Sequence, residues 1–212
     1  MTVRKVVTSS SSHFRGYFPS LKNGMPIPWE SQLEGAFLRL LELSPQVASY
    51  AVQPSKERIP LDGGSFTHVP DLRVFRNDGS DWWFEVKPEN KLKIAAVKAR
   101  LDAAQEYFAR TGRRYSVVSE TLIKNEHVEK NLAGLMYHRR GPLLCNKELE
   151  EVAELLRKHT PRNFSELLTV FGKPKGWRLL GLGVVGIDLD KPIKDDSQVY
   201  FYGGHRHANI FA

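Results

Sequence analysis

Hydrophobic residues near the start of the chain recur at the spacing of one helix face. Within residues 30–43, Leu33, Phe37 and Leu41 stand four positions apart, and Pro45 follows the run. This periodicity predicts an amphipathic helix, because residues at that spacing share one face, and proline ends it. We expect the helix to pack a single apolar stripe against a core.

Between residues 47 and 87 the spacing becomes extended, and turn signals separate the segments. Short strands are predicted over residues 47–53, 56–60, 66–69, 71–76 and 81–87. The sequence Asn-Asp-Gly-Ser at residues 77–80 favours a tight hairpin, because these residue types tolerate the backbone angles of a short turn. The last two strands are therefore expected to pair antiparallel.

A second helical pattern, rich in alanine, covers residues 92–111 and is followed by Gly112 and a short strand over residues 115–118. The order helix, strands, hairpin, helix, strand is typical of an α/β fold in which helices flank a mixed sheet. We expect that domain to span residues 29–140. Residues 1–28 are polar and rich in Ser, Gly and Pro, which predicts an irregular arm with at most one short extended piece.

The pattern changes again at residues 139–142, where Arg-Arg-Gly-Pro indicates a linker. Beyond the linker, helices are predicted over residues 146–159, 163–171 and 176–185, and a strand-like segment over residues 198–202. Three short helices followed by a β-tail are typical of a winged helix. Residues 141–212 are therefore predicted to form a small winged-helix-like domain that binds a partner protein, DNA or both.

Composition and charge narrow the class of protein. The 212 residues are 41% hydrophobic, which is enough for a core and excludes a chain that is disordered throughout. Lys and Arg number 31 against 24 Asp and Glu, and this net charge of +7 suits a polyanion, although many basic proteins bind none. Without a run of about 20 apolar residues a membrane span is excluded. Cys145 is the single cysteine, which excludes an intramolecular disulfide and a Cys-cluster zinc site and favours the cytoplasm.

The strongest chemical signal lies in the predicted hairpin. Asp71 opens one of its strands, and Glu85 and Lys87 close the other. Side chains two positions apart point to one face of a strand, so Glu85 and Lys87 project together and the turn brings Asp71 beside them. Phe84 and Val86 alternate with them as apolar positions, which predicts that Glu85 and Lys87 face away from the core.

Two carboxylates this close repel each other unless a cation lies between them. Oxygen ligands alone favour Mg²⁺, with Mn²⁺ as a substitute, and the backbone carbonyl of Val86 offers one more oxygen. Such an ion activates water at a phosphodiester, while Lys87 orients or deprotonates that water or stabilises the developing charge. The same pattern also has a purely structural explanation. In that case Asp71 is a turn residue, and Glu85 and Lys87 form an exposed pair.

Several motifs together resemble one known family. They are Gly-Tyr-Phe-Pro-Ser-Leu-Lys at 16–22, Pro-Trp-Glu-Ser-Gln-Leu-Glu at 28–34, Val-Gln-Pro at 52–54, Val-Pro-Asp at 69–71, Phe-Glu-Val-Lys-Pro at 84–88 and Gly-Ile-Asp-Leu-Asp-Lys-Pro at 186–192. In this order the chain is similar to the TnsA-type endonuclease subunit of heteromeric transposases, within the PD-(D/E)xK restriction-endonuclease-like superfamily. The likeness runs through most of the chain, so it is more specific than the hairpin pattern alone.

The resemblance implies a restriction-endonuclease-like domain with a Mg²⁺-dependent active site, whose positions are Glu34, Asp71, Glu85 and Lys87. Some relatives carry Gln in place of Glu85, and Glu is the better metal ligand. The implied reaction is cleavage of the 5′ ends of a transposon, the non-transferred strands, in cut-and-paste transposition. The implied partners are double-stranded transposon-end DNA, a TnsB-type DDE transposase that cuts and joins the 3′ ends, and a TnsC-type AAA+ ATPase regulator. The place of action is the bacterial cytoplasm, at the nucleoid.

Two other functions stay open on the sequence. One is a restriction- or repair-type nuclease on the same scaffold, and the other is a non-catalytic adaptor that binds DNA or a regulator. Glu34 is open in the same way: it lies at the margin of the apolar stripe of the first helix and is either a third metal ligand or a solvated helix glutamate.

Further polar residues have a functional and a structural interpretation. The basic residues expected to contact DNA, or else to form a merely solvated face, are Lys91, Lys93, Lys98, Arg139, Arg140, Lys173, Lys175 and Arg178. Gln53 either lines the active site or makes a hydrogen bond at a strand end. His205 and His207 form a His-x-His pair, which is too sparse for a metal site without a third ligand.

Overall fold

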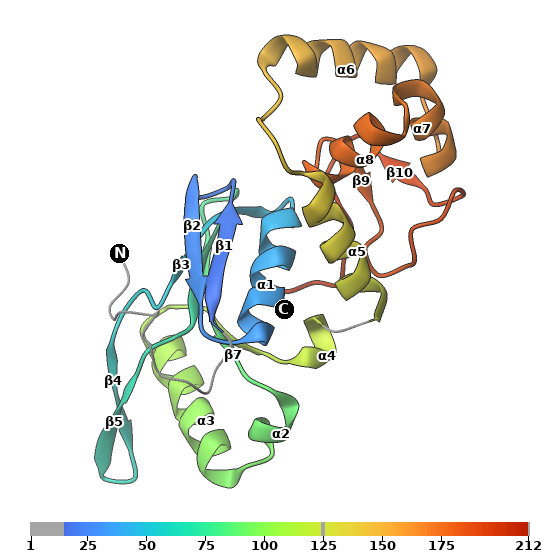
Figure 1. Ribbon diagram of the computed structural model, residues 1–212. Coiled ribbons are helices and arrows are strands. Elements are labelled where there is room, and N and C mark those ends of the chain that lie inside the picture. The colour runs from blue at the N-terminus through green and yellow to red at the C-terminus, as the bar shows by residue number, and fades with distance from the viewer. Residues whose placement is uncertain (1–14, 124–125, 212) are drawn as a thin grey trace. The chain divides into compact units, whose positions relative to one another are not determined.

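The computed structural model describes residues 15–123 and 126–211, and these residues form two compact units (Figure 1). Unit 1 contains the described residues up to Glu42, those from Gln46 to Ile123, and the segment 209–211. Unit 2 contains residues 43–45 and 126–208. Within these described ranges, none of the helices combines the length and the apolar character that crossing a membrane requires.

Unit 1 is built on a mixed sheet flanked by helices, as the sequence predicts. Its elements are β1 (Gly16–Ser20), β2 (Met25–Trp29), α1 (Gln32–Leu43), β3 (Val47–Val52), β4 (Glu57–Leu61), β5 (Gly64–His68), β6 (Leu72–Arg76), β7 (Asp81–Val86), α2 (Glu89–Leu92), α3 (Ala95–Arg110), β8 (Tyr115–Val118) and α4 (Glu120–Ile123). The central sheet has the order β3-β6-β7-β8, in which β8 runs parallel to β7 and the other neighbours are antiparallel. This architecture fits a restriction-endonuclease-like fold.

Strand β7 is covered on both faces, which corrects one expectation. Phe84 packs edge-on against Phe37 of α1, with ring centroids 5.2 Å apart. On the opposite face, Trp83 packs against Phe108 of α3 at 5.3 Å. Because Glu85 points the same way as Trp83, it is buried, only 5% exposed, and does not face away from the core.

The predicted irregular arm contains a β-hairpin, formed by β1 and β2. The buried carboxylate of Glu42 holds it to α1, because it accepts hydrogen bonds from Ser20 Oγ at 2.8 Å and the Leu21 amide at 2.7 Å. The Tyr50 hydroxyl donates to the same carboxylate at 2.6 Å. The sequence pattern missed this hairpin because its anchor lies on a helix some 20 positions away. The remainder of the predicted arm, residues 1–14, lies outside the described residues.

Unit 2 contains the three predicted short helices, one further helix and a short β-pair. Its elements are α5 (Glu126–His138), α6 (Asn146–His159), α7 (Phe164–Phe171), α8 (Lys173–Gly181), β9 (Gly186–Ile187) and β10 (Val199–Tyr200). β9 and β10 pair antiparallel, and an isolated bridge joins Asn163 to Gln198. Cys145 is the N-cap residue of α6, and Asn146 is the first helical residue.

The compact unit begins before the predicted boundary at residue 141, because α5 packs against α8. A Cβ atom at Gly181 would lie 2.7 Å from the carbonyl oxygen of Leu135, so the two helices approach at a distance that only glycine permits. At the other end, segment 209–211 belongs to unit 1, although the sequence places it in the second domain.

Phe211 is expected to stabilise unit 1. Its ring lies 5.9 Å from that of Trp82 and 6.0 Å from that of Phe84, with the Arg76 guanidinium 4.8 Å from its centroid. Truncating this half-buried ring in Phe211→Ala should lower the free energy of unfolding by about 2 kcal/mol. Urea unfolding measures the change. Tyr202→Ala, which removes an 89% exposed ring, is the control and should be near neutral; equal stability of the two variants would contradict this role.

Candidate active site

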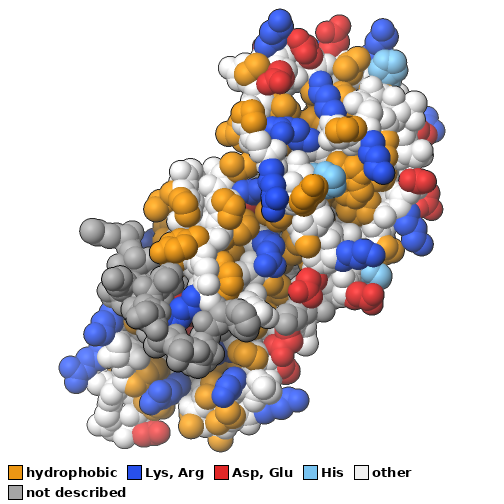
Figure 2. Space-filling model, in the orientation of Figure 1, with side chains coloured by type: hydrophobic (Ala, Val, Ile, Leu, Met, Phe, Trp, Pro, Cys, Tyr) orange, Lys and Arg blue, Asp and Glu red, His pale blue; other side chains and the backbone are white. Residues whose placement is uncertain are grey.

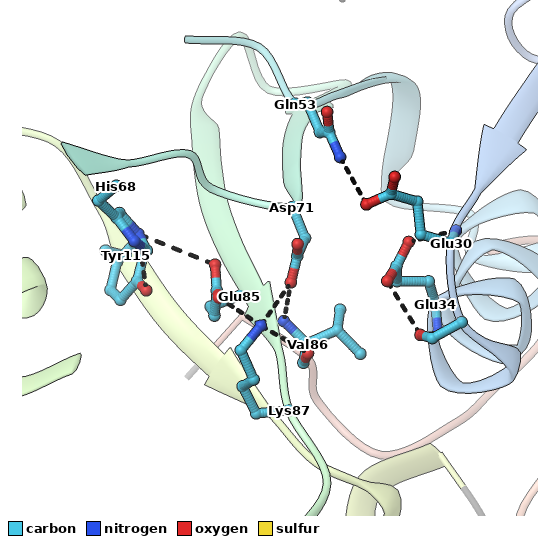
Figure 3. Close-up of polar contacts among 10 residues, drawn as sticks. Glu30, Glu34, Gln53, His68, Asp71, Glu85, Val86, Lys87 and Tyr115 are labelled. Carbon is cyan, nitrogen blue, oxygen red and sulfur yellow. Dashed lines mark hydrogen bonds and ion pairs between the residues drawn. The ribbon is translucent and has the colours of Figure 1, made fainter. Parts of the chain in front are cut away.

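The hairpin of β6 and β7 brings three predicted site residues together. Asp71 precedes β6 and accepts a hydrogen bond from the Val86 amide at 2.8 Å. Lys87 follows β7, and its Nζ lies 2.5 Å from Glu85 Oε1 and 3.5 Å from Asp71 Oδ2 (Figure 3). An ammonium therefore lies between two carboxylates, and the backbone of the hairpin fixes this arrangement.

Gln53 supports this arrangement from the end of β3. Its amide donates to the Asp71 carbonyl at 2.9 Å, and its own backbone is left-handed with φ of 45°. Its side chain points to Glu30 and donates to that carboxylate at 3.2 Å (Figure 3). The hydrogen bond at the strand end is thus present. The side chain is directed to Glu30, away from Asp71.

Glu34 lies in the first turn of α1, on the wall of a pocket beside the hairpin. Its carboxylate accepts hydrogen bonds from the Glu30 amide and the Ser31 hydroxyl, both at 2.9 Å. The pocket has a volume of about 520 Å³ and is lined by Ser31, Gln32, Leu33, Glu34, Val86, Lys87, Pro88, Lys91, Val97 and Glu120. Glu34 and Lys87 therefore share one cavity, and the helix start holds the Glu34 carboxylate in a fixed orientation.

Electrostatics in the site favour an additional positive charge. Burial and the neighbouring charge of Glu85 raise the pKa of Asp71 to about 7. Burial also raises the pKa of Glu85, and it raises that of Glu34 together with the charge of Asp71. Burial acts to lower the pKa of Lys87, but Asp71 and Glu85 outweigh it and raise that pKa above its ordinary value. Three carboxylates thus share one ammonium, an excess that a divalent cation would neutralise.

The oxygen atoms near Lys87 are of the chemical type that binds a hard cation. The oxygens near Lys87 Nζ are those of Asp71, Glu85 and the Val86 carbonyl, the last at 3.4 Å. Glu85 Oε2 is buried and makes no hydrogen bond within the described part of the chain. Oxygen donors of this kind are what Mg²⁺ prefers. In the described ranges, no three His, Cys, Asp or Glu side chains are already arranged around one ion position.

Sequence reasoning missed two residues next to Glu85. His68 Nε2 lies 3.8 Å from Glu85 Oε2, and the Tyr115 hydroxyl lies 3.2 Å from the same nitrogen. Burial, and then the charge of Lys87, lowers the pKa of His68 to about 4, so the imidazole is neutral near pH 7. The available signal was the position of His68, three residues before Asp71 at the end of a predicted strand.

Some of the predicted DNA-contacting residues are exposed, whereas others are buried or hydrogen-bonded within the protein. The exposed side chains are Lys91, Lys93, Lys98, Arg140 and Lys173, whereas Lys175 is half-buried. Arg139 is buried, 6% exposed, which corrects its assignment to the surface. Arg178 donates to the carbonyls of Arg140 and Pro142, so its guanidinium fastens the linker. On the face shown in Figure 2, Lys and Arg side chains are interspersed with hydrophobic and acidic ones.

His205 does not form a metal pair with His207. It is 2% exposed, its Nδ1 accepts from the Ile187 amide at 3.2 Å, and its Nε2 faces the Leu180 carbonyl at 2.9 Å. Both ring nitrogens are therefore used inside unit 2, which requires a neutral ring protonated on Nε2.

The buried His205 should make unit 2 less stable in mild acid. Burial lowers its pKa from 6.5 to about 4, so below pH 6.5 the unfolded chain binds a proton that the folded chain does not. Between pH 7 and pH 5 the wild type should lose about 2 kcal/mol more than His205→Gln, which cannot take that proton. Urea unfolding at both pH values measures the difference. The same pH dependence in both proteins would contradict this assignment.

Comparison with known proteins identifies part of the chain. Residues 44–120 match the family described as TnsA-like endonuclease N terminal. This range includes Asp71, Glu85 and Lys87 and ends before α5, whereas Glu34 lies ahead of it. A search of curated proteins finds no match to the chain. This match confirms, for residues 44–120, the resemblance to a TnsA-type endonuclease that the motifs indicate.

Proposed function

We propose that this chain, a TnsA-type endonuclease by the match of residues 44–120, cleaves the 5′ ends of a transposon in cut-and-paste transposition. The observation that carries the proposal is the convergence of Asp71, Glu85 and Lys87 beside a pocket that Glu34 also lines. A TnsA-like domain belongs to Tn7-type transposition systems, which act on DNA with partner proteins. The bonds cleaved would be those of the non-transferred strands.

The reaction is metal-dependent phosphodiester hydrolysis. Asp71, Glu85 and the Val86 carbonyl would hold Mg²⁺, or Mn²⁺ in its place, with Glu34 as a further ligand. When bound, the ion supplies an activated water and neutralises charge on the phosphate. Lys87 stays protonated because its carboxylate neighbours raise its pKa. It therefore acts as a cation and hydrogen-bond donor toward the phosphate oxygens and not as the base.

The DNA backbone would run along the start of the helical region that follows Lys87. Lys91, Lys93 and Lys98 lie on or next to α2 and α3, and all three side chains are exposed. Lys91 also lines the pocket, so it is the basic side chain placed to hold the phosphate next to the one being cut. Such contacts position DNA without reading its sequence.

Unit 2 is proposed to be a winged-helix-like module that contacts DNA, a regulator or both. Three features support this: the helix order α6-α7-α8, the bridge between Asn163 and Gln198, and the β9–β10 pair after the helices. The basic residues it offers are the exposed Arg140 and Lys173 and the half-buried Lys175. The proposed partners are a TnsB-type DDE transposase, which processes the 3′ ends, and a TnsC-type AAA+ ATPase. The proposed setting is the bacterial cytoplasm.

Strand-resolved cleavage of a transposon-end plasmid tests the proposal. The full chain is incubated with Mg²⁺, with and without the transposase encoded beside it, and nicks are mapped on both strands. We expect 5′-strand nicks that need both the transposase and Mg²⁺. Nicks at the same rate without the transposase would favour a restriction- or repair-type nuclease. No nicks on 5′ strands in any condition, with 3′ joining intact, would favour an adaptor.

A further inference from the structure

The two oxygens of the Glu85 carboxylate have different surroundings. Oε1 lies 2.5 Å from Lys87 Nζ. Oε2 is buried and receives no hydrogen bond from any residue that the structure describes. The side chain is 7% exposed, so solvent gives it little compensation. A buried carboxylate oxygen without a donor is unfavourable, and such a group calls for a nearby N–H or O–H.

His68 is the group that faces this oxygen. Its Nε2 lies 3.8 Å from Glu85 Oε2 and 3.2 Å from the Tyr115 hydroxyl (Figure 3). The ring packs edge-on against Phe66, Phe108 and Tyr115, at centroid distances of 6.3, 6.3 and 5.7 Å. These aromatic contacts hold the ring in place with Nε2 turned to the polar groups.

We propose that His68 is a positioning residue for Glu85: its Nε2–H is directed at Oε2 across 3.8 Å, an electrostatic contact longer than a hydrogen bond, so that Oε1 stays turned to the Lys87 side. The inference rests on the proposed function, in which Glu85 is a metal ligand. A carboxylate ligand whose orientation is set by a neighbouring polar group binds metal in a defined geometry. The Tyr115 hydroxyl shares the same nitrogen, so it competes with Glu85 for the proton.

The tautomer of His68 gives a test that is independent of cleavage. Nitrogen chemical shifts of the ¹⁵N-histidine-labelled full chain, measured without metal, show which ring nitrogen carries the proton. We expect the proton on Nε2 of His68. A proton on Nδ1 would make Nε2 the acceptor of the Tyr115 hydroxyl. That result would overturn the proposal whether or not the protein cuts DNA.

Three variants separate positioning from packing. His68→Phe keeps the ring and removes the donor, His68→Gln keeps an N–H near the position of Nε2, and Tyr115→Phe removes the competing hydroxyl. In calorimetric titration with Mn²⁺, His68→Phe should bind about 10- to 100-fold more weakly than the wild type. His68→Gln should recover most of that affinity, and Tyr115→Phe should bind as tightly as the wild type.

The outcomes distinguish this inference from the proposed function. Wild-type affinity in His68→Phe would assign the ring to packing alone and overturn the proposal. Equal loss in His68→Gln and His68→Phe would do the same, because the donor would then be irrelevant. If the wild type neither binds Mn²⁺ nor cuts DNA, the proposed function fails, while the His68 tautomer still decides whether Nε2 carries the proton that the positioning role requires.

Discussion

Asp71→Asn should reduce 5′-strand nicking by at least about 10³-fold while leaving 3′-strand joining intact. The amide oxygen of Asn can still accept the Val86 N–H that Asp71 holds at 2.8 Å, so the hairpin should keep its shape. The charge that would bind the cation is lost. The readout is strand-resolved mapping of nicks on transposon-end DNA in the presence of the transposase.

The same variant should be more stable than the wild type. Burial and Glu85 raise the pKa of Asp71 to about 7, so above that pH its ionised form is more costly in the folded than in the unfolded chain. Asn removes that cost, and thermal unfolding at pH 8 should show a higher midpoint. Lost activity with gained stability is typical of an active-site charge and not of a structural residue.

Asp81→Asn is the matched control on the same hairpin. Asp81 pairs with Arg73 at 2.6 Å, and both side chains are at least a third exposed. A pair of this kind contributes at most about 1 kcal/mol, so 5′ nicking should stay near the wild-type rate. Persistent 5′ nicking in Asp71→Asn, or an equal loss in Asp81→Asn, would show that the assigned site is wrong.

Lys87→Met should separate catalysis from metal binding. Without the Lys87 ammonium, the phosphate loses a positively charged hydrogen-bond donor of the proposed mechanism. Cleavage should therefore fall by about 10²- to 10³-fold. The carboxylates of Asp71 and Glu85 then lose the positive charge that lies 3.5 and 2.5 Å from them. The site becomes more negative by one charge, so Mn²⁺ should bind at least as tightly as in the wild type.

Lys91→Met is the control for this experiment. Lys91 lines the same pocket but is exposed, so its removal should weaken cleavage by less than about 10-fold through the DNA backbone contact. Both variants are compared by nicking rate and by Mn²⁺ titration. Cleavage by Lys87→Met within 10-fold of the wild type would remove Lys87 from the proposed mechanism. Loss of Mn²⁺ binding together with cleavage would assign Lys87 to maintaining the site's structure instead.

The sequence predicted the parts of the site that local signals determine. The turn at residues 77–80 and the period of two along the strands were enough to place Asp71 beside Glu85 and Lys87. The mixed sheet followed from the order of elements, since a hairpin is antiparallel and a strand that follows a crossover helix can be parallel. These are short-range rules, and they held.

What the sequence did not predict depends on contacts between distant segments. His68 reaches Glu85 only because the end of β5 lies beside Glu85 of β7 and Tyr115 of β8. The burial of Glu85 was missed because Trp83 packs α3 onto the face that was expected to be solvated. A single alternating strand does not show whether one or both of its faces will be covered.

The central claim is that Asp71 and Glu85 hold a divalent cation beside Lys87. A crystal of the full chain soaked in Mn²⁺, with data collected to record anomalous scattering, tests it most directly. We expect one anomalous peak within coordination distance of the Asp71 and Glu85 carboxylates and the Val86 carbonyl. No peak there at saturating Mn²⁺, or a peak bound only by other residues, would contradict it.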